Sequence, residues 1–191
     1  MLEAAALLCF AYLLGSVSSA ILLSKIMGFE DPRKQGSNNP GATNVLRIAG
    51  KKAAFLTLVG DFLKGLLPVL VAHWLQFDLL LVALTGFAAF VGHCFPVFFR
   101  FQGGKGVATA IAATFAFDWM SGVILGATWL LFAKVFKISS LAAIISCAAL
   151  PLVILWRTQD LQLASVFVLL SAILIWRHKA NIQRLIRGTE S

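Results

Sequence analysis

Successive apolar runs, each about long enough to cross a membrane as a helix, restrict the fold of this chain more than any other feature. The hydrocarbon core of a bilayer is about 30 Å thick, and a helix that spans it needs about 20 apolar residues. By this ruler we expect seven spans, near residues 4–26, 53–75, 79–98, 104–119, 120–136, 138–156 and 160–177. A hydrophobic fraction of 60% with only 13% charged residues excludes an ordinary soluble domain. The sequence therefore predicts an all-α polytopic membrane bundle that forms a single domain over residues 1–191.

The fourth and fifth expected spans are short, and only Asp118 and Gly122 mark the boundary between them. Residues 104–136 therefore also fit a re-entrant hairpin, which would leave five spans. Both versions keep Lys105 and Lys134 on the same side of the membrane, so the choice does not change where the polar segments meet.

The positions of the basic residues predict the orientation of the bundle. Fourteen of the sixteen lysines and arginines lie on alternate connections, within residues 25–52, 100–105, 134–137 and 177–187. Positive charge accumulates in cytoplasmic loops, so we expect the N-terminus outside and the C-terminus in the cytoplasm. The net charge of +8 therefore indicates orientation, and we expect no nucleic acid as a partner.

The three cysteines do not indicate a disulfide framework or a metal site. Cys9, Cys94 and Cys147 are far apart, and each lies inside an apolar run. No group of residues has the spacing of metal ligands, so we expect neither a metal nor a cofactor.

One spacing resembles an acyltransferase motif by coincidence. His73 and Asp78 have the His-x-x-x-x-Asp spacing of many membrane glycerolipid acyltransferases, in which the histidine acts as a base. In the expected topology this pair lies at the outer end of the second span, away from the basic segments. We therefore expect the pair to have no catalytic role.

The first cytoplasmic segment, residues 28–47, is rich in groups that bind phosphate. Ser37, Asn38 and Asn44 offer hydroxyl and amide groups beside Arg47, whose planar guanidinium can hold a phosphate with two parallel hydrogen bonds. The alternative is a solvated turn beside anionic headgroups, but lysine and arginine alone would suffice for that.

The second cytoplasmic segment places Gly103, Gly104 and Gly106 around Lys105, immediately before the fourth span. Glycine allows a close approach of the backbone, and the N-terminus of the next helix attracts an anion. The pattern predicts a phosphate cradle, although it lacks the spacing of a P-loop. A purely structural turn is the alternative.

The C-terminal segment carries His178 and Asn181, which are three residues apart and can face one site from the same side of a helix. An amphipathic helix at the membrane surface is the alternative interpretation of this tail. Within the second span, Asp61 and Lys64 have the same spacing and can form an ion pair, as a strut or as a lining of the site.

Taken together, these segments resemble the bacterial acyl-phosphate:glycerol-3-phosphate acyltransferases, the PlsY family. The resemblance covers nearly the whole chain, and its motifs follow one another in order. They are Gly15-Ser16, residues 36–44 with Arg47, Asp61-x-x-Lys-Gly65, Gly92-His93, Pro96, Gly103-Gly-Lys-Gly106, Ser140-Leu141, and Asn181 with Arg184, Gly188 and Glu190. Ser139 and Ser140 are alternatives for the serine of the third motif.

The resemblance implies transfer of a fatty acyl group from acyl phosphate to the 1-hydroxyl of sn-glycerol 3-phosphate, which yields 1-acylglycerol 3-phosphate and phosphate. It implies a multi-pass protein of the bacterial cytoplasmic (inner) membrane with its site facing the cytoplasm, and a functional link to an enzyme that forms acyl phosphates. Catalytic roles are expected for Ser37, Arg47, Lys105 and His178. Substrate-binding roles are expected for Asn38, Asn44, Gly103, Gly104, Gly106, Ser140 and Asn181, and supporting roles for Asp61, Lys64 and Glu190.

The donor in such a reaction is already a mixed anhydride, so positioning and charge stabilisation can carry the catalysis. We expect Lys105 and Arg47 to stabilise the phosphate and the oxyanion. The proton of the attacking hydroxyl goes to a substrate phosphate oxygen or to His178, and an acyl-enzyme on Ser37 is a further alternative.

Two other classes of protein fit parts of the sequence. A transporter of phosphate esters would place polar groups near the middle of the bilayer, whereas this chain gathers them at one face. A lipid-binding scaffold would explain the basic tail but not two separate glycine-rich anion sites.

Overall fold

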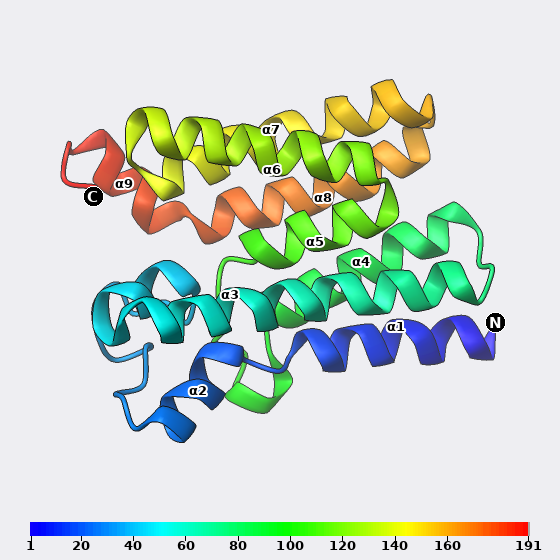
Figure 1. Ribbon diagram of the computed structural model, residues 1–191. Helices are drawn as coiled ribbons and strands as arrows, with labels where there is room; N and C mark the ends of the chain where they lie inside the picture. Colours follow the sequence, from blue (N-terminus) through cyan, green and yellow to red (C-terminus); the bar gives the residue numbers. More distant parts are fainter. Residues whose placement is uncertain (191) are drawn as a thin grey trace.

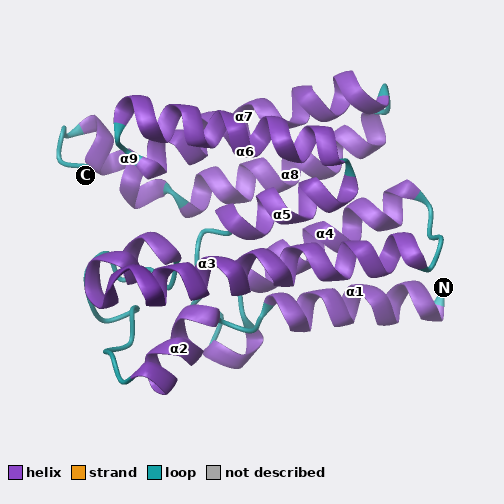
Figure 2. Ribbon diagram, viewed as in Figure 1, coloured by secondary structure: helices purple, strands orange, loops and turns teal. Residues whose placement is uncertain are grey.

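The computed structural model describes residues 1–190, and every regular element in that range is helical (Figures 1 and 2). The all-α prediction is therefore confirmed for the described part of the chain. The elements are α1 Leu2–Gly15, α2 Ser19–Met27, α3 Ala42–Trp74, α4 Leu79–Cys94, the 3-10 turn η1 Val97–Phe99, α5 Val107–Phe117, α6 Trp119–Phe136, α7 Ser139–Thr158, α8 Leu161–Arg177 and α9 Lys179–Ile186.

Each of the seven expected apolar runs corresponds to a helix or to a bent pair of helices. The helices α3, α6 and α7, together with α4 and the turn that follows it, are long and apolar enough to cross a membrane. The pairs α1 with α2 and α8 with α9 pass the same test jointly, with bends of 42° and 58°. Helix α5 is apolar but has only 11 residues, so length and composition support up to six spans within residues 1–190.

The first expected span, 4–26, consists of two helices with a bend between them and is not one continuous helix. The helix stops at Gly15, and a new helix starts where the hydroxyl of Ser18 accepts a hydrogen bond from the backbone N–H of Ile21 at 3.5 Å. The break exposes the carbonyl of Val17, and the ammonium of Lys64 in α3 donates to it at 2.8 Å. A polar side chain from another helix thus stabilises the break.

The second expected span starts earlier than predicted, because the helix begins at Ala42 and not near residue 53. Gly50 interrupts it with a φ of 80° and a ψ of −176°, a conformation that glycine adopts without a steric penalty. The short helical segment before this kink carries Asn44 and Arg47. The kink therefore sets the direction in which Arg47 projects.

Helices α1 and α4 cross at glycines and make direct backbone contact. A Cβ atom added at Gly15 would lie 2.1 Å from the carbonyl oxygen of Ala89, and one added at Gly92 would lie 2.2 Å from that of Tyr12. Small residues at a crossing allow membrane helices to approach closely. This contact fixes the end of α4 from which the glycine-rich loop leaves.

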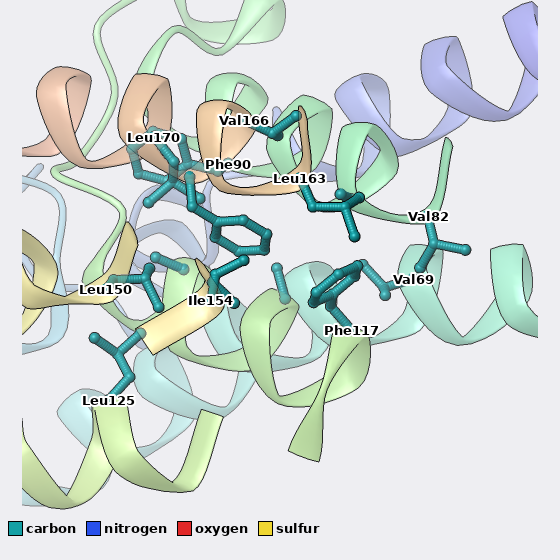
Figure 3. Close-up of a cluster of buried hydrophobic side chains, with 14 of the residues drawn as sticks. Val69, Val82, Phe90, Phe117, Leu125, Leu150, Ile154, Leu163, Val166 and Leu170 are labelled. Carbon is teal, nitrogen blue, oxygen red and sulfur yellow. The ribbon is translucent and has the colours of Figure 1, made fainter. Parts of the chain in front are cut away.

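The main hydrophobic core lies between α3, α4, α5, α7 and α8 (Figure 3). Phe90, Leu150, Ile154 and Leu170 are fully buried there. The ring of Phe90 reaches the start of α5, because a Cβ atom at Gly106 would lie 2.3 Å from its Cε2 atom. The core therefore forms the floor beneath the glycine-rich loop.

The polar segments predicted to meet do lie at one end of the bundle. Residues 28–41, the glycine-rich loop and α9 share that end, and the N-terminus and the α3–α4 turn lie at the other (Figure 1). His73 lies in the last turn of α3, and Asp78 ends the α3–α4 turn, where its carboxylate caps α4 by accepting from the N–H of Leu81 at 2.9 Å. Asp78 therefore has a structural role, and the pair lies at the end of the bundle away from the other polar segments (Figure 1).

Candidate active site

A cavity of about 480 Å³ opens at the polar end of the bundle, between the start of α3, the start of α5, α6, α7 and the C-terminal segment. It brings together side chains from all three polar segments. The expected site residues that line it are Ser37, Asn44, Arg47, Asp61, Lys105, Gly106, Ser140, His178, Asn181 and Glu190. Asn38, Gly103, Gly104 and Lys64 do not line the cavity.

Asn44 holds the first polar segment in shape. Its Oδ1 atom accepts from the N–H of Ser37 at 2.8 Å, and its Nδ2 atom donates to the carbonyls of Pro32 at 3.0 Å and Gln35 at 2.9 Å. The side chain is buried, with 1% of its surface exposed. These bonds give Asn44 a supporting role in the loop, and they place Ser37 at the rim of the cavity.

Arg47 lies three residues after Asn44 on the same short helical segment, so the two side chains share one face of it. Asn44 anchors this face to the loop, and Arg47 lines the cavity. The kink at Gly50 then turns the chain into the long part of α3. Asn44 before it and the kink at Gly50 after it therefore fix the position of Arg47.

Lys105 lies in the glycine-rich loop between Gly104 and Gly106. Gly106 precedes α5 with a φ of 83°, which residues with a Cβ atom rarely adopt. Burial lowers the pKa of Lys105 to about 8; the carboxylate of Glu190 opposes this shift, and nearby arginines add to it. Lys105 is therefore a cation at neutral pH that loses its proton only slightly above it.

Glu190 connects the C-terminal segment to α7 and α9. Its Oε1 atom accepts from the hydroxyl of Ser140 at 2.7 Å and from Nδ2 of Asn181 at 2.5 Å, and its Oε2 atom accepts from Nε of Arg184 at 2.5 Å. Burial favours the neutral acid, but these three donors outweigh it and lower the pKa of Glu190. The ionised carboxylate fixes Ser140 and Asn181 at the wall of the cavity.

His178 lies between the last residue of α8 and the first of α9, with only 2% of its surface exposed. Its Nδ1 atom lies 2.8 Å from the carbonyl oxygen of Leu174. A carbonyl accepts hydrogen bonds only, so Nδ1 carries the proton and Nε2 has the free lone pair. Burial lowers the pKa of His178 to about 4, so the ring is neutral at physiological pH.

Two buried polar atoms from residues that line the cavity have no hydrogen-bond partner within residues 1–190. They are Oδ1 of Asn181, an acceptor, and Nε1 of Trp129, a donor. An unpaired buried polar group costs about 1–3 kcal/mol. A ligand that supplies a hydroxyl beside Asn181 would remove this cost.

Asp61 and Lys64 form the ion pair that the sequence predicts, with Nζ and Oδ1 2.9 Å apart and both side chains almost fully buried. The backbone carbonyl of Asp61 accepts from the hydroxyl of Thr109 at 2.9 Å, which joins α3 to α5. Lys64 also holds the break after α1. The pair therefore acts as a strut, and Asp61 also reaches the cavity wall.

Several other lining residues were given no site role from the sequence, although His93 and Arg184 belong to the motifs that carry the family resemblance. These lining residues are Asn39, Thr43, His93, Trp129, Ser139 and Arg184. Asn39 and Thr43 lie within the first polar segment, so its composition is the signal that would have identified them. Trp129 is a single aromatic residue in an apolar run, where no sequence pattern distinguishes it from residues that face lipid. Within residues 1–190, no three His, Cys, Asp or Glu side chains are grouped so that they could hold a metal ion.

Comparison with known proteins gives one consistent result. The sequence model described as glycerol-3-phosphate acyltransferase matches residues 5–188. Two relatives with the same description, from Methylococcus capsulatus and Thioalkalivibrio sulfidiphilus, are each 50% identical; the first alignment covers 97% of this chain and 93% of the relative, and the second covers 100% and 94%.

Two solved structures are similar over almost the entire chain. Both are crystal structures of PlsY, an integral membrane glycerol 3-phosphate acyltransferase, one in its glycerol 3-phosphate form and one in its lysophosphatidic acid form. The TM-scores are 0.94 and 0.90, at 38% sequence identity, and each alignment covers 99% of this chain and 94% of the other.

Proposed function

This chain belongs to the glycerol-3-phosphate acyltransferase family, and from that premise we propose that its acyl donor is a fatty acyl phosphate. The family expected from the motifs is confirmed, and the chain is a glycerol-3-phosphate acyltransferase of a bacterial membrane. The proposed products are 1-acyl-sn-glycerol 3-phosphate and inorganic phosphate. Such a donor also implies a functional link to an enzyme that forms acyl phosphates.

The observation that carries this proposal is one cavity that has Arg47 and Lys105 at its polar end, in addition to Arg184, which is paired with Glu190, and an apolar wall beside them. Arg47 and Lys105 come from separate segments, so each can hold one phosphate. Phe55, Leu58 and Ile111 form part of the apolar wall. Phe55 is 64% exposed on the outside of the bundle, where a fatty chain can extend into lipid.

The proposed reaction is a direct displacement on the carbonyl carbon of the acyl phosphate. The 1-hydroxyl oxygen of glycerol 3-phosphate forms the new C–O bond, and the bond from the carbonyl carbon to the phosphate oxygen breaks. The charge that develops on the carbonyl oxygen and on the departing phosphate is stabilised by Lys105 and Arg47. No covalent intermediate on the protein is needed, because both substrates are held in one cavity.

The proton of the attacking hydroxyl goes to a phosphate oxygen of a substrate in this proposal. A phosphate monoester has a second pKa of about 6, whereas burial lowers the pKa of His178 to about 4. The phosphate is therefore the stronger base near neutral pH. The proposed role of His178 is to place its unprotonated Nε2 atom beside the substrate as a hydrogen-bond acceptor.

The remaining substrate contacts are proposed as follows. The backbone of Gly103, Gly104 and Gly106 shapes the cradle for the phosphate of glycerol 3-phosphate, and Asn38 lies between Ser37 and Asn39, which line the cavity. The free Oδ1 atom of Asn181 accepts from a glycerol hydroxyl. Ser140 keeps the carboxylate of Glu190 in position for this contact.

We further propose seven membrane crossings in the cytoplasmic membrane of the cell, with the N-terminus outside and the active site facing the cytoplasm. The support for counting α5 and α6 as two crossings is the ion pair between Asp118, in the α5–α6 turn, and Arg157, near the end of α7, at 3.2 Å. This pair links the turn to the end of the bundle opposite the cavity (Figure 1).

The test is turnover by purified protein in detergent, given palmitoyl phosphate and glycerol 3-phosphate. Release of phosphate with stoichiometric formation of lysophosphatidate is expected for the wild-type protein. Lys105→Ala should lose turnover, and Lys134→Ala, which removes a lysine outside the cavity, should retain it. Turnover with acyl-CoA or acyl carrier protein and none with palmitoyl phosphate would contradict the proposed donor.

The choice of base is tested separately. His178→Ala should lower kcat but should keep the decrease in kcat at acidic pH that marks protonation of the catalytic base. Loss of this decrease in the variant would assign the role of the base to His178. Ser37 has no histidine partner among residues 1–190, which disfavours an acyl-enzyme. Trapping with radiolabelled palmitoyl phosphate should leave the protein unlabelled.

A further inference from the structure

The glycine-rich loop is held by a residue that does not line the cavity. Arg177, the last residue of α8, donates from Nη2 to the carbonyl of Gly103 at 2.7 Å and from Nε to the carbonyl of Gly104 at 3.1 Å. Its guanidinium also lies 5.4 Å above the ring of Phe95, which restricts its position. Two carbonyls of the loop therefore point towards one fixed cation.

The direction of these carbonyls determines where the amide groups of the loop point. In a trans peptide the C=O and N–H groups point in opposite directions. The N–H of Gly104 points away from Arg177 and donates to the carbonyl of His93 at 3.2 Å. The N–H of Lys105 also points away from Arg177, and no acceptor within residues 1–190 takes it.

We propose that Arg177 is a positioning residue for phosphate binding: it fixes the peptide planes of the glycine-rich loop, so that the Lys105 amide and side chain face the substrate phosphate. This inference rests on the proposed function of the cavity. Arg177 acts through the loop and makes no contact with substrate itself.

The side chain at this position needs two properties that arginine combines. The two carbonyls belong to consecutive residues, and the guanidinium fork reaches both at once, whereas an ammonium group has no planar fork. Arg177 also immediately precedes His178 in the chain, which lines the cavity. The end of α8 thus sets the distance between the loop and His178.

The experiment compares Arg177→Ala, Arg177→Lys and, as the control, Lys179→Ala. Lys179 is a neighbouring cation that lies 5.3 Å above the ring of Trp176 and has no bond to the loop. Steady-state kinetics are measured with palmitoyl phosphate and glycerol 3-phosphate, alongside thermal unfolding of each variant. The displaced loop should bind the substrate phosphate less well, so Arg177→Ala should raise the KM for glycerol 3-phosphate at least about tenfold and lower kcat less. A displacement of about 1 Å in an active site can cost about 100-fold in total.

Arg177→Lys should recover only part of this loss, because it keeps the charge without the fork. Added guanidinium chloride at millimolar concentration should lower the raised KM of Arg177→Ala and leave the wild-type protein unchanged. Lys179→Ala should have wild-type kinetics. Rescue by guanidinium also separates positioning from misfolding, since an unfolded variant would not recover.

Three outcomes would overturn the inference. They are an unchanged KM in Arg177→Ala, complete recovery in Arg177→Lys, and a KM in Arg177→Ala that guanidinium does not lower. In each case the wild-type protein turns over palmitoyl phosphate, so the proposed function stands. Failure of the wild-type protein to use that donor would instead contradict the proposed function.

Discussion

Gly104 and His93 provide a direct test of how tightly the glycine-rich loop is fixed. A Cβ atom on Gly104 would lie 2.2 Å from Nε2 of His93, and the three nearest atoms all belong to that imidazole ring. An ordinary contact begins at 3.4 Å, so the loop and the ring must separate by about 1.2 Å in Gly104→Ala. The φ of Gly104 is not in the positive region, so this contact, and not backbone strain, opposes the substitution.

The expected cost follows from that displacement. A shift of about 1 Å in an active site can cost about 100-fold, or about 2.7 kcal/mol of transition-state stabilisation. We therefore expect Gly104→Ala to lower kcat/KM for glycerol 3-phosphate about 100-fold. His93→Ala removes the obstructing ring, so the double variant should recover about tenfold relative to Gly104→Ala, a coupling within the range of about 0.5–3 kcal/mol for residues in contact.

Gly103→Ala is the matched control for this pair. Its Cβ atom would meet the backbone oxygens of His93 at 2.1 Å and Cys94 at 2.6 Å, together with Cδ of Pro96 at 2.5 Å. None of these atoms is removed when His93 becomes alanine, so His93→Ala should not rescue Gly103→Ala.

The assay is phosphate release at several concentrations of glycerol 3-phosphate, for all single and double variants, with their thermal unfolding measured in the same detergent. Wild-type kinetics in Gly104→Ala would refute the reasoning. Equal rescue of both alanine variants by His93→Ala would also refute it, because the recovery would then not depend on the ring contact.

Three further predictions concern other charged groups. Burial lowers the pKa of Lys105 to about 8 and the lysine is cationic below that value, so kcat/KM for glycerol 3-phosphate should fall above about pH 8; Lys105→Arg, which stays charged, should move that fall upwards in a pH profile. Lys64→Met should destabilise the protein by about 3–5 kcal/mol, because it leaves the buried Asp61 carboxylate unpaired, and thermal unfolding should show most of the loss regained in Lys64→Met/Asp61→Leu. Asp118→Asn and Arg157→Gln, at the end away from the cavity, should each change stability by no more than about 1 kcal/mol and leave kcat unchanged, since their ion pair is partly exposed.

The helical bundle could be predicted from the sequence because the length of an apolar run is set by the bilayer itself. The breaks within the runs could not. The interruption at Ser16–Ser18 depends on Lys64, which is 47 residues from the carbonyl that it binds. A prediction from the lengths of apolar runs contains no information about such a contact, so it did not place a break between α1 and α2.

The polar segments of the site were predictable for a related reason. A cytoplasmic loop that only orients the bundle or attracts anionic headgroups needs lysine and arginine alone, so the added concentration of asparagine, serine and glycine in residues 36–47 stood out. The separate roles of the residues within a segment were not predictable. The amide of Asn44 has the same chemistry whether it binds substrate or the loop, and only the positions of Pro32 and Gln35 show that it binds the loop.

His93 and Arg177 show that the glycine-rich motif alone does not determine the conformation of its loop. Backbone polar groups close to the hydrocarbon region need partners within the protein. In the glycine-rich loop, the carbonyls of Gly103 and Gly104 find theirs at the end of α8, and the N–H of Gly104 finds its partner at the end of α4. The glycines permit the loop conformation, but two distant helices select it. Substitution of Arg177 should therefore alter the KM for glycerol 3-phosphate even though its side chain does not line the cavity.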